Sequence, residues 1–93
     1  MQSIKEQLAD KLSDPQWKQR YEELNQRFYN EPTLMSGRRV NQILDVGNTT
    51  RFKLYHDGKL HKVKLGDKMQ NPSKYSKETV IMLLVDWELN PNG

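Results

Sequence analysis

The chain has 93 residues, of which 34% are hydrophobic and 29% are charged, and it contains no cysteine. This length fits one domain with a modest core, and the lack of cysteine excludes disulfides and thiolate metal sites. The longest apolar run, Val80 to Val85, is too short to cross a bilayer, and the N-terminus has no secretory apolar region. The sequence therefore predicts a folded, soluble, cytoplasmic protein with no membrane partner.

Positive charge is concentrated in the middle of the chain. Residues 1–33 carry a net charge of −1, residues 34–77 carry +7, and residues 78–93 carry −3. A basic centre between acidic ends indicates that the middle of the chain binds a polyanion. An ordinary solvated, lysine-rich surface is the alternative, and the helix-turn-helix pattern described below favours the polyanion.

Two helices are predicted at the N-terminus. Ile4, Leu8 and Leu12 lie on one stripe of the first helix. Asp14 is a good N-cap and Pro15 a good first helical residue, so a second helix should begin there. These helices form the N-terminal extension that we expect over residues 1–33.

The second helix carries a face of large apolar side chains and ends before Pro32. Spacings of four, three and four place them together: Trp17, Tyr21, Leu24 and Phe28. One interpretation is that this face packs on a DNA-binding core, which we favour. The other is that it is a self-association surface.

A helix-turn-helix pattern follows. Val40, Ile43 and Leu44 have helical spacing, in a helix that Ser36 or Gly37 can open and that covers roughly Arg38 to Leu44. The turn is Asp45 to Gly47.

The next helix should begin at Asn48, which is a strong N-cap candidate, and end at Gly58, which suits a left-handed position. Phe52 is expected in the core. Arg51 and Lys53 are expected to face solvent in the free protein.

A basic wing comes next. Lys62 to Leu65 alternates at period two, which predicts a strand with Val63 and Leu65 inward and two lysines outward. The wing tip covers residues 69–73, and residues 74–76 form the return strand. A last helix should begin after Ser76, with its buried face formed by Val80, Leu83, Leu84 and Trp87.

Four short segments carry a family resemblance: Thr50-Arg51-Phe52-Lys53-Leu54, Asp57-Gly58-Lys59-Leu60, Val63-Lys64-Leu65-Gly66 and Tyr75-Ser76-Lys77-Glu78. In this order and spacing, residues 35–87 resemble the AlpA-type, excisionase-like branch of the MerR winged helix-turn-helix group, small regulators of prophages and integrative elements. The chain departs from the pattern at three points: Arg51 replaces an apolar residue, His61 a proline, and Gly47-Asn48 a Ser-Arg pair.

The resemblance implies a mainly α fold with a small β wing, in which residues 34–93 form a winged helix-turn-helix domain. Double-stranded DNA is the expected partner, and a homodimer, an oligomer on adjacent sites or a recombinase are further candidates. Side chains at the start of a recognition helix can reach base edges, Arg bonding guanine through two donors, while wing lysines contact phosphates. The predicted DNA-binding residues are Arg38, Asn48, Thr49, Thr50, Arg51, Lys53, Lys62, Lys64 and Lys68.

No enzyme signature is present. His56 and His61 have no metal-site spacing, and neither a phosphate loop nor a catalytic triad is visible. We therefore expect no catalytic activity, no metal and no cofactor.

Two classes of function remain. The first is a sequence-specific DNA-binding regulator, or a recombination directionality factor, of a prophage or mobile element. The second is an interaction protein that uses the same scaffold to bind a recombinase, a replication protein or a host defence protein, because a fold does not fix a function.

Overall fold

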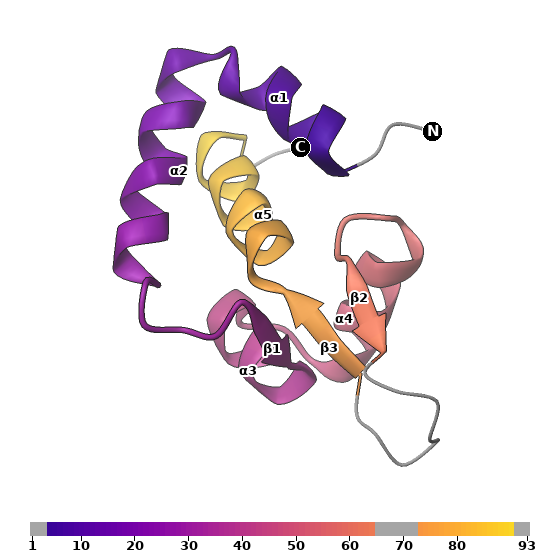
Figure 1. The fold of residues 1–93 in the computed structure, drawn as a ribbon. Helices are drawn as coiled ribbons and strands as arrows, with labels where there is room; N and C mark the ends of the chain where they lie inside the picture. Colours follow the sequence, from indigo (N-terminus) through magenta and orange to yellow (C-terminus); the bar gives the residue numbers. More distant parts are fainter. Residues whose placement is uncertain (1–3, 65–72, 91–93) are drawn as a thin grey trace. The chain divides into compact units, whose positions relative to one another are not determined.

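The computed structural model describes residues 4–64 and 73–90. Over these residues the chain is mainly helical with a small antiparallel sheet (Figure 1), which confirms the coarse prediction of the fold class. The elements are α1 (Ile4–Leu12), α2 (Pro15–Arg27), β1 (Leu34–Ser36), α3 (Gly37–Leu44), α4 (Asn48–His56), β2 (Lys62–Lys64), β3 (Ser73–Ser76) and α5 (Lys77–Leu89). They form two compact units: a terminal unit of residues 1–30 and 81–93, and a central unit of residues 31–80.

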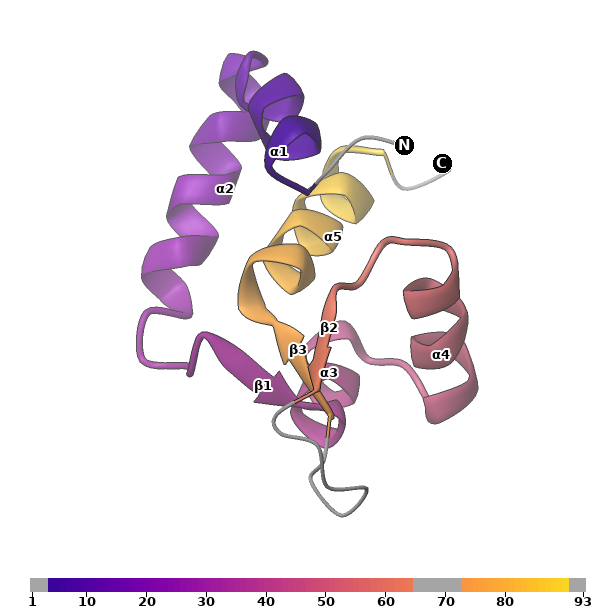
Figure 2. The same cartoon turned by 45° about the vertical axis from the view of Figure 1, so that its right-hand side comes forward.

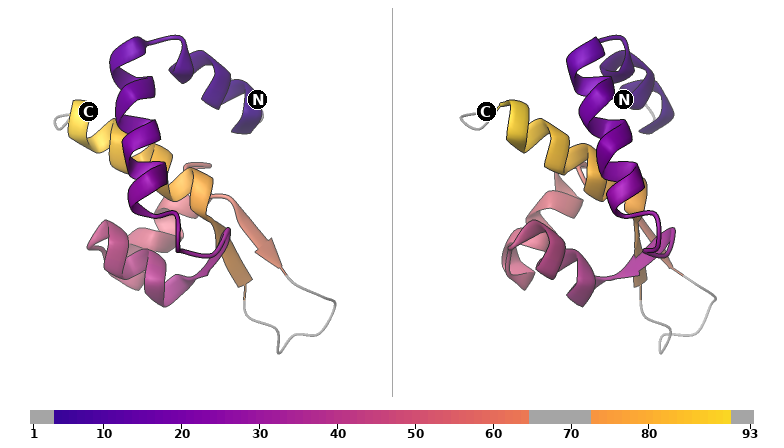
Figure 3. Two further views of the ribbon diagram at one scale, coloured as in Figure 1. Left: turned by 60° about the vertical axis from the view of Figure 1, so that its left-hand side comes forward. Right: turned by 90° about the vertical axis from the view of Figure 1, so that its left-hand side faces the viewer.

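The second N-terminal helix begins where its sequence predicts. The Asp14 side chain accepts a hydrogen bond from the backbone N–H of Gln16 at 3.0 Å, and Pro15 is the first residue of α2. Proline fits this position because the first helical N–H groups need no partner within the helix. Figure 3 shows the sharp turn of the chain between α1 and α2.

The aromatic face of α2 packs against residues 81–89 of α5 inside the terminal unit (Figure 1). Trp17 and Leu24 are buried together with apolar residues of α5, namely Ile81, Met82 and Val85. The stripe predicted on α1 (Ile4, Leu8 and Leu12) packs against the same cluster. Other residues of the same chain therefore cover the aromatic face of α2, for which the alternative interpretation was a self-association surface.

The predictions for the last helix need correction. The expected boundary at residue 33 placed all of α5 in the second domain, whereas residues from Ile81 onward belong to the terminal unit. Of the predicted buried face, Val80 and Leu83 are buried, but Leu84 and Trp87 are only half-buried. The apolar run in α5 surrounds most of the helix, so periodicity alone could not identify which side would pack.

The central unit contains a three-stranded sheet in the order β1-β3-β2, with both pairs antiparallel. In this register Met35 lies opposite Tyr75 on one side of β3, and Lys62 lies opposite Tyr75 on the other. The return strand is confirmed. The sequence did not predict β1, because three residues give no alternating pattern and their pairing partner is 40 residues away.

The helices α3 and α4 lie between β1 and β2 in the chain and are joined by a short turn (Figure 2). Ser36 caps α3 by accepting a hydrogen bond from the backbone N–H of Arg39 at 3.2 Å, as predicted. Asp45 ends α3 in the left-handed region, with φ of 57°. Gly58 follows α4 with φ of 79°, which confirms the prediction of a left-handed glycine.

The core of the central unit joins both helices to the sheet. Its buried apolar residues are Met35, Val40, Leu44, Leu54, Leu60, Tyr75 and Val80. One buried hydroxyl fixes the start of α5: Thr79 Oγ1 donates to the carbonyl of Ser76 at 2.9 Å and accepts from the N–H of His61 at 3.2 Å. With both bonds made, this polar side chain is tolerated in the core.

Candidate nucleic-acid interface

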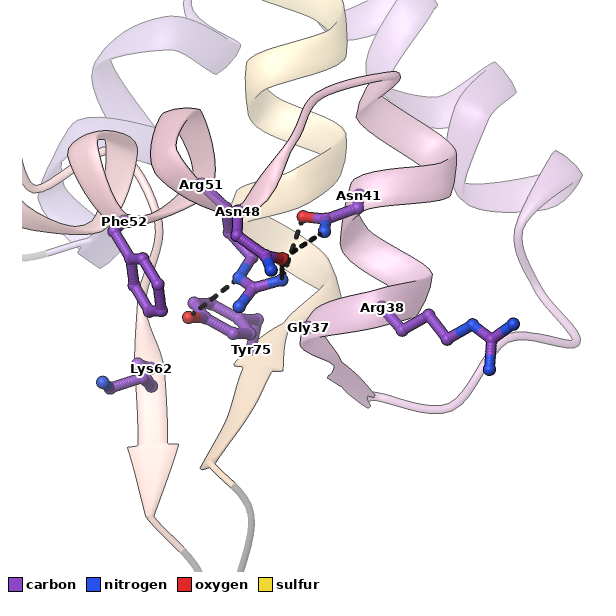
Figure 4. Close-up of a pocket in the computed structure, with 8 residues that line it drawn as sticks. All are labelled: Gly37, Arg38, Asn41, Asn48, Arg51, Phe52, Lys62 and Tyr75. Carbon is purple, nitrogen blue, oxygen red and sulfur yellow. Dashed lines mark hydrogen bonds between the residues drawn. The ribbon is translucent and has the colours of Figure 1, made fainter.

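A groove of about 500 Å³ opens on the central unit (Figure 4). Its lining comes from the beginnings of α3 and α4 and from the strands β2 and β3. The lining residues are Gly37, Arg38, Asn41, Asn48, Arg51, Phe52, Lys62 and Tyr75. Three of them are cationic, two are carboxamides and none is acidic, so the groove suits a negatively charged or polar ligand.

Arg51 lies at the centre of this groove and joins three elements. Its Nη1 donates to the side-chain oxygens of Asn41 and Asn48, each at 3.0 Å, and its Nε donates to the Tyr75 hydroxyl at 3.3 Å. The guanidinium carbon also lies 5.0 Å from the ring centroid of Phe52 and 5.5 Å from that of Tyr75. Figure 4 shows the guanidinium between these groups, so Arg51 is half-buried rather than facing solvent as predicted.

The absence of a side chain at Gly37 makes this position possible. A Cβ atom at residue 37 would lie 2.7 Å from the guanidinium carbon of Arg51 and 2.8 Å from its Nη1. Real Cβ atoms do not approach other heavy atoms so closely, because the separation lies well inside van der Waals contact. Gly37 therefore leaves the space that the guanidinium occupies.

The capping role predicted for Asn48 was wrong. Gly47 is the N-cap of α4 and makes no side-chain capping bond, and Asn48 is the first helical residue. The Asn48 side-chain oxygen instead accepts hydrogen bonds from Asn41 at 2.8 Å and from Arg51. These donors are polar groups from α3 and from the next turn of α4, and they hold the carboxamide away from the backbone N–H groups that a cap would satisfy.

Within residues 4–64 and 73–90, no carboxylate forms an ion pair with Arg51. All its hydrogen-bond acceptors in the described residues are neutral. By contrast, Arg39 forms an ion pair with Glu31, and this hydrogen bond lowers the pKa of the Glu31 carboxyl. Arg20 of the terminal unit is likewise paired, with Glu88. The half-buried Arg51 cation therefore keeps an uncompensated charge, which an external anion would stabilise.

The other two cations of the groove differ in how they are held. The Lys62 ammonium lies 4.3 Å from the ring centroid of Tyr55, so an aromatic face of α4 supports it. Arg38 is exposed and extends away from the Arg51 network (Figure 4). Neither forms an ion pair with any residue in the described ranges.

The structure brings together only part of the predicted DNA-binding set. Arg38, Asn48, Arg51 and Lys62 line the groove, whereas the other predicted residues of α4, namely Thr49, Thr50 and Lys53, are exposed outside the lining. Lys68 lies outside the described residues, and of Lys64 only the backbone is described.

Sequence reasoning missed four residues of the groove. Phe52 was predicted to be buried, but it is 46% exposed, because the buried side of α4 is the side that carries Leu54. No binding role was predicted for Asn41, Gly37 or Tyr75, and their contacts with Arg51 span 10 to 24 positions. The close approach of the Arg51 guanidinium to Gly37 left no signal in the sequence other than a glycine at the start of a helix.

No family model, curated protein or solved structure matches this chain. Among residues 4–64 and 73–90, no helix is both long enough and apolar enough to cross a membrane. The same ranges contain no group of three or more histidines and carboxylates placed to share a metal ion.

Proposed function

We propose that the chain binds double-stranded DNA through its central unit, with α4 in the major groove and β2 beside the sugar-phosphate backbone. The observation that carries this proposal is the groove around Arg51: its lining has three cationic side chains and no acidic one, and no carboxylate of the described residues pairs with Arg51. Duplex DNA supplies a regular array of anions that such a surface can contact.

The order of elements supports the same proposal. Two helices joined by a short turn stand between β1 and an antiparallel pair of strands, an order compatible with a winged helix-turn-helix. In such modules the second helix enters the major groove. The central unit also contains ten of the fifteen Lys and Arg residues of the chain against five acidic residues, so positive charge lies in the unit that would contact DNA.

Within this function, the resemblance to excisionase-like proteins favours a regulator or recombination directionality factor of a mobile element. These two roles differ in the DNA sites that the protein occupies. Sequencing of the fragments that the protein selects from the genome of its source distinguishes them: sites in promoters mean transcriptional control, and sites beside recombination points mean a directionality factor.

Salt-dependent binding of a random-sequence duplex tests the proposal directly. The Arg38→Ala/Lys62→Ala double variant should bind more weakly and should reduce the slope of log K against log salt by up to about two units, since each phosphate contact contributes about 0.9. The matched control is Lys5→Ala/Lys18→Ala, which removes the same charge from exposed positions of α1 and α2. This control should keep the parental slope.

Two results would contradict the proposal. If the parental protein shows almost no DNA binding at low and at moderate salt, the interaction-protein function becomes the better explanation. If both double variants change the slope equally, binding depends on total charge and the groove has no particular role.

A further inference from the structure

Phe52 is a large apolar side chain that the fold leaves on the surface. It is 46% exposed, and it lines the groove together with Arg51 and Lys62. Single exposed apolar residues are common on protein surfaces, so exposure alone carries little meaning. Phe52, however, lies between two cations of a proposed DNA interface, and this position suits a ligand that is anionic and also offers an apolar group.

The helix geometry places Phe52 in the middle of the open side of α4. Asn48, Phe52 and His56 are all exposed and are spaced by four residues, which aligns them along one face of the helix. The opposite side carries Leu54, which is buried. When α4 enters a groove of DNA with this exposed side facing the bases, the ring of Phe52 in the second turn of the helix points toward them.

The Arg51 network also limits where the Phe52 ring can lie. The guanidinium carbon of Arg51 lies 5.0 Å from the ring centroid. Figure 4 shows the ring extending from α4 into the space between Tyr75 and Lys62. A ring held in this way loses little freedom on binding, and its uncovered part remains apolar.

We infer that Phe52 is a specificity-determining residue that contacts the 5-methyl group of thymine in the major groove. This inference rests on the proposed function. The thymine methyl is the apolar group that base edges offer in the major groove, and Phe is among the side chains that contact it. Cytosine and uracil lack this methyl group, so the contact favours thymine at one or two positions of the binding site.

Uracil substitution tests the inference without changing the protein. A duplex is first selected from a random library with the parental protein, and each thymine of the selected site is then replaced in turn by uracil. One or two replacements should weaken binding about fourfold, the factor that corresponds to one buried methyl group. The other replacements should have no effect.

The same scan with variants assigns the methyl contact to Phe52. In Phe52→Ala the sensitive positions should bind thymine and uracil equally, and in Phe52→Leu part of the difference should remain. Tyr29→Ala is the matched control, because Tyr29 is 79% exposed and belongs to the terminal unit. This control should reproduce the parental scan.

The outcomes separate the inference from the function on which it rests. A selected site with a flat uracil scan, or with the same sensitive positions in Phe52→Ala, overturns the role of Phe52 while DNA binding stands. A parental protein that selects no duplex overturns both.

Discussion

Replacement of Arg51 by Ala should destabilise the protein, because this side chain holds α3, α4 and β3 together. The variant loses three hydrogen bonds, of 3.0, 3.0 and 3.3 Å, and two contacts with aromatic rings. Each hydrogen bond contributes about 0.5–1.5 kcal/mol and each exposed cation–π contact about 0.5–1 kcal/mol. The groove is open to water, which can replace part of the lost bonding, so we expect a loss of about 2 kcal/mol.

Urea unfolding followed by circular dichroism measures this loss. Lys53→Ala is the control, since Lys53 is exposed on the same helix and its replacement should change the free energy of unfolding by less than about 0.5 kcal/mol. Tyr75→Phe removes a single acceptor of the Arg51 network and should cost less than Arg51→Ala. An Arg51→Ala protein as stable as the Lys53→Ala protein would refute the structural role of the network.

The network also changes what Arg51 can do to DNA. Its Nε and Nη1 already donate hydrogen bonds, and only Nη2 has no acceptor in the described part of the chain. The bidentate contact with guanine expected from the sequence would require the side chain to leave Asn41 and Asn48. We therefore expect Arg51 to donate from Nη2 to a phosphate, so Arg51→Ala should weaken binding to all sequences and lower the salt slope by about one unit. A loss confined to sites with one particular guanine would show base reading instead.

Two further predictions concern close contacts. Gly37→Ala should destabilise the parental protein, because the added Cβ would lie 2.7 Å from the guanidinium carbon of Arg51. In the Arg51→Ala background the same replacement should be neutral or stabilising. A double-mutant cycle by urea unfolding compares the two changes in the free energy of unfolding, and equal changes in both backgrounds would contradict the prediction. In the terminal unit, the hydrogen bond from Arg20 lowers the pKa of Glu88 below its usual 4.5. The ion pair should therefore stabilise the fold above that pH and lose its effect as the pH falls through the lowered pKa, so the parental protein and Glu88→Gln should differ in stability at neutral pH and converge in acid.

Rules that depend on a few neighbouring residues predicted much of the fold. Asp14 with Pro15, Ser36 and Gly58 each marked a helix end, because capping bonds and left-handed turns are decided within one turn of chain. The apolar stripe of α1 was also identified correctly, since its spacing alone defines the face.

The features that sequence reasoning missed depend on contacts between distant segments. Asn48 looks like a cap until Asn41 and Arg51 are placed beside it, and Phe52 looks like a core residue until α4 turns Leu54 inward. Charge pattern could identify the basic region, but it could not predict that Arg51 would be held by neutral groups. The candidate site was therefore predictable as a region, and its central contacts were not.

The two tryptophans of the chain provide a direct test of how the terminal unit is packed. The sequence pattern favoured packed positions for both, but only Trp17 is buried: it is 4% exposed, and its Nε1 donates to Asp86 at 2.8 Å. The Trp17 ring also stacks on Tyr21, with centroids 5.0 Å apart. Trp17→Ala removes a filled core position and a hydrogen bond, so it should lower the free energy of unfolding by about 3–5 kcal/mol.

Trp87 is half-buried and lies outside the apolar cluster of the terminal unit, so Trp87→Ala should cost less than about 1.5 kcal/mol. Urea unfolding of both variants, followed by circular dichroism, compares the two positions on the same scale. Trp17→Phe keeps much of the ring volume but loses the bond to Asp86, and it should fall between Trp17→Ala and the parental protein. Equal losses for the two alanine variants would mean that α5 presents Trp87 to the core, and the packing of α2 on α5 would have to be revised.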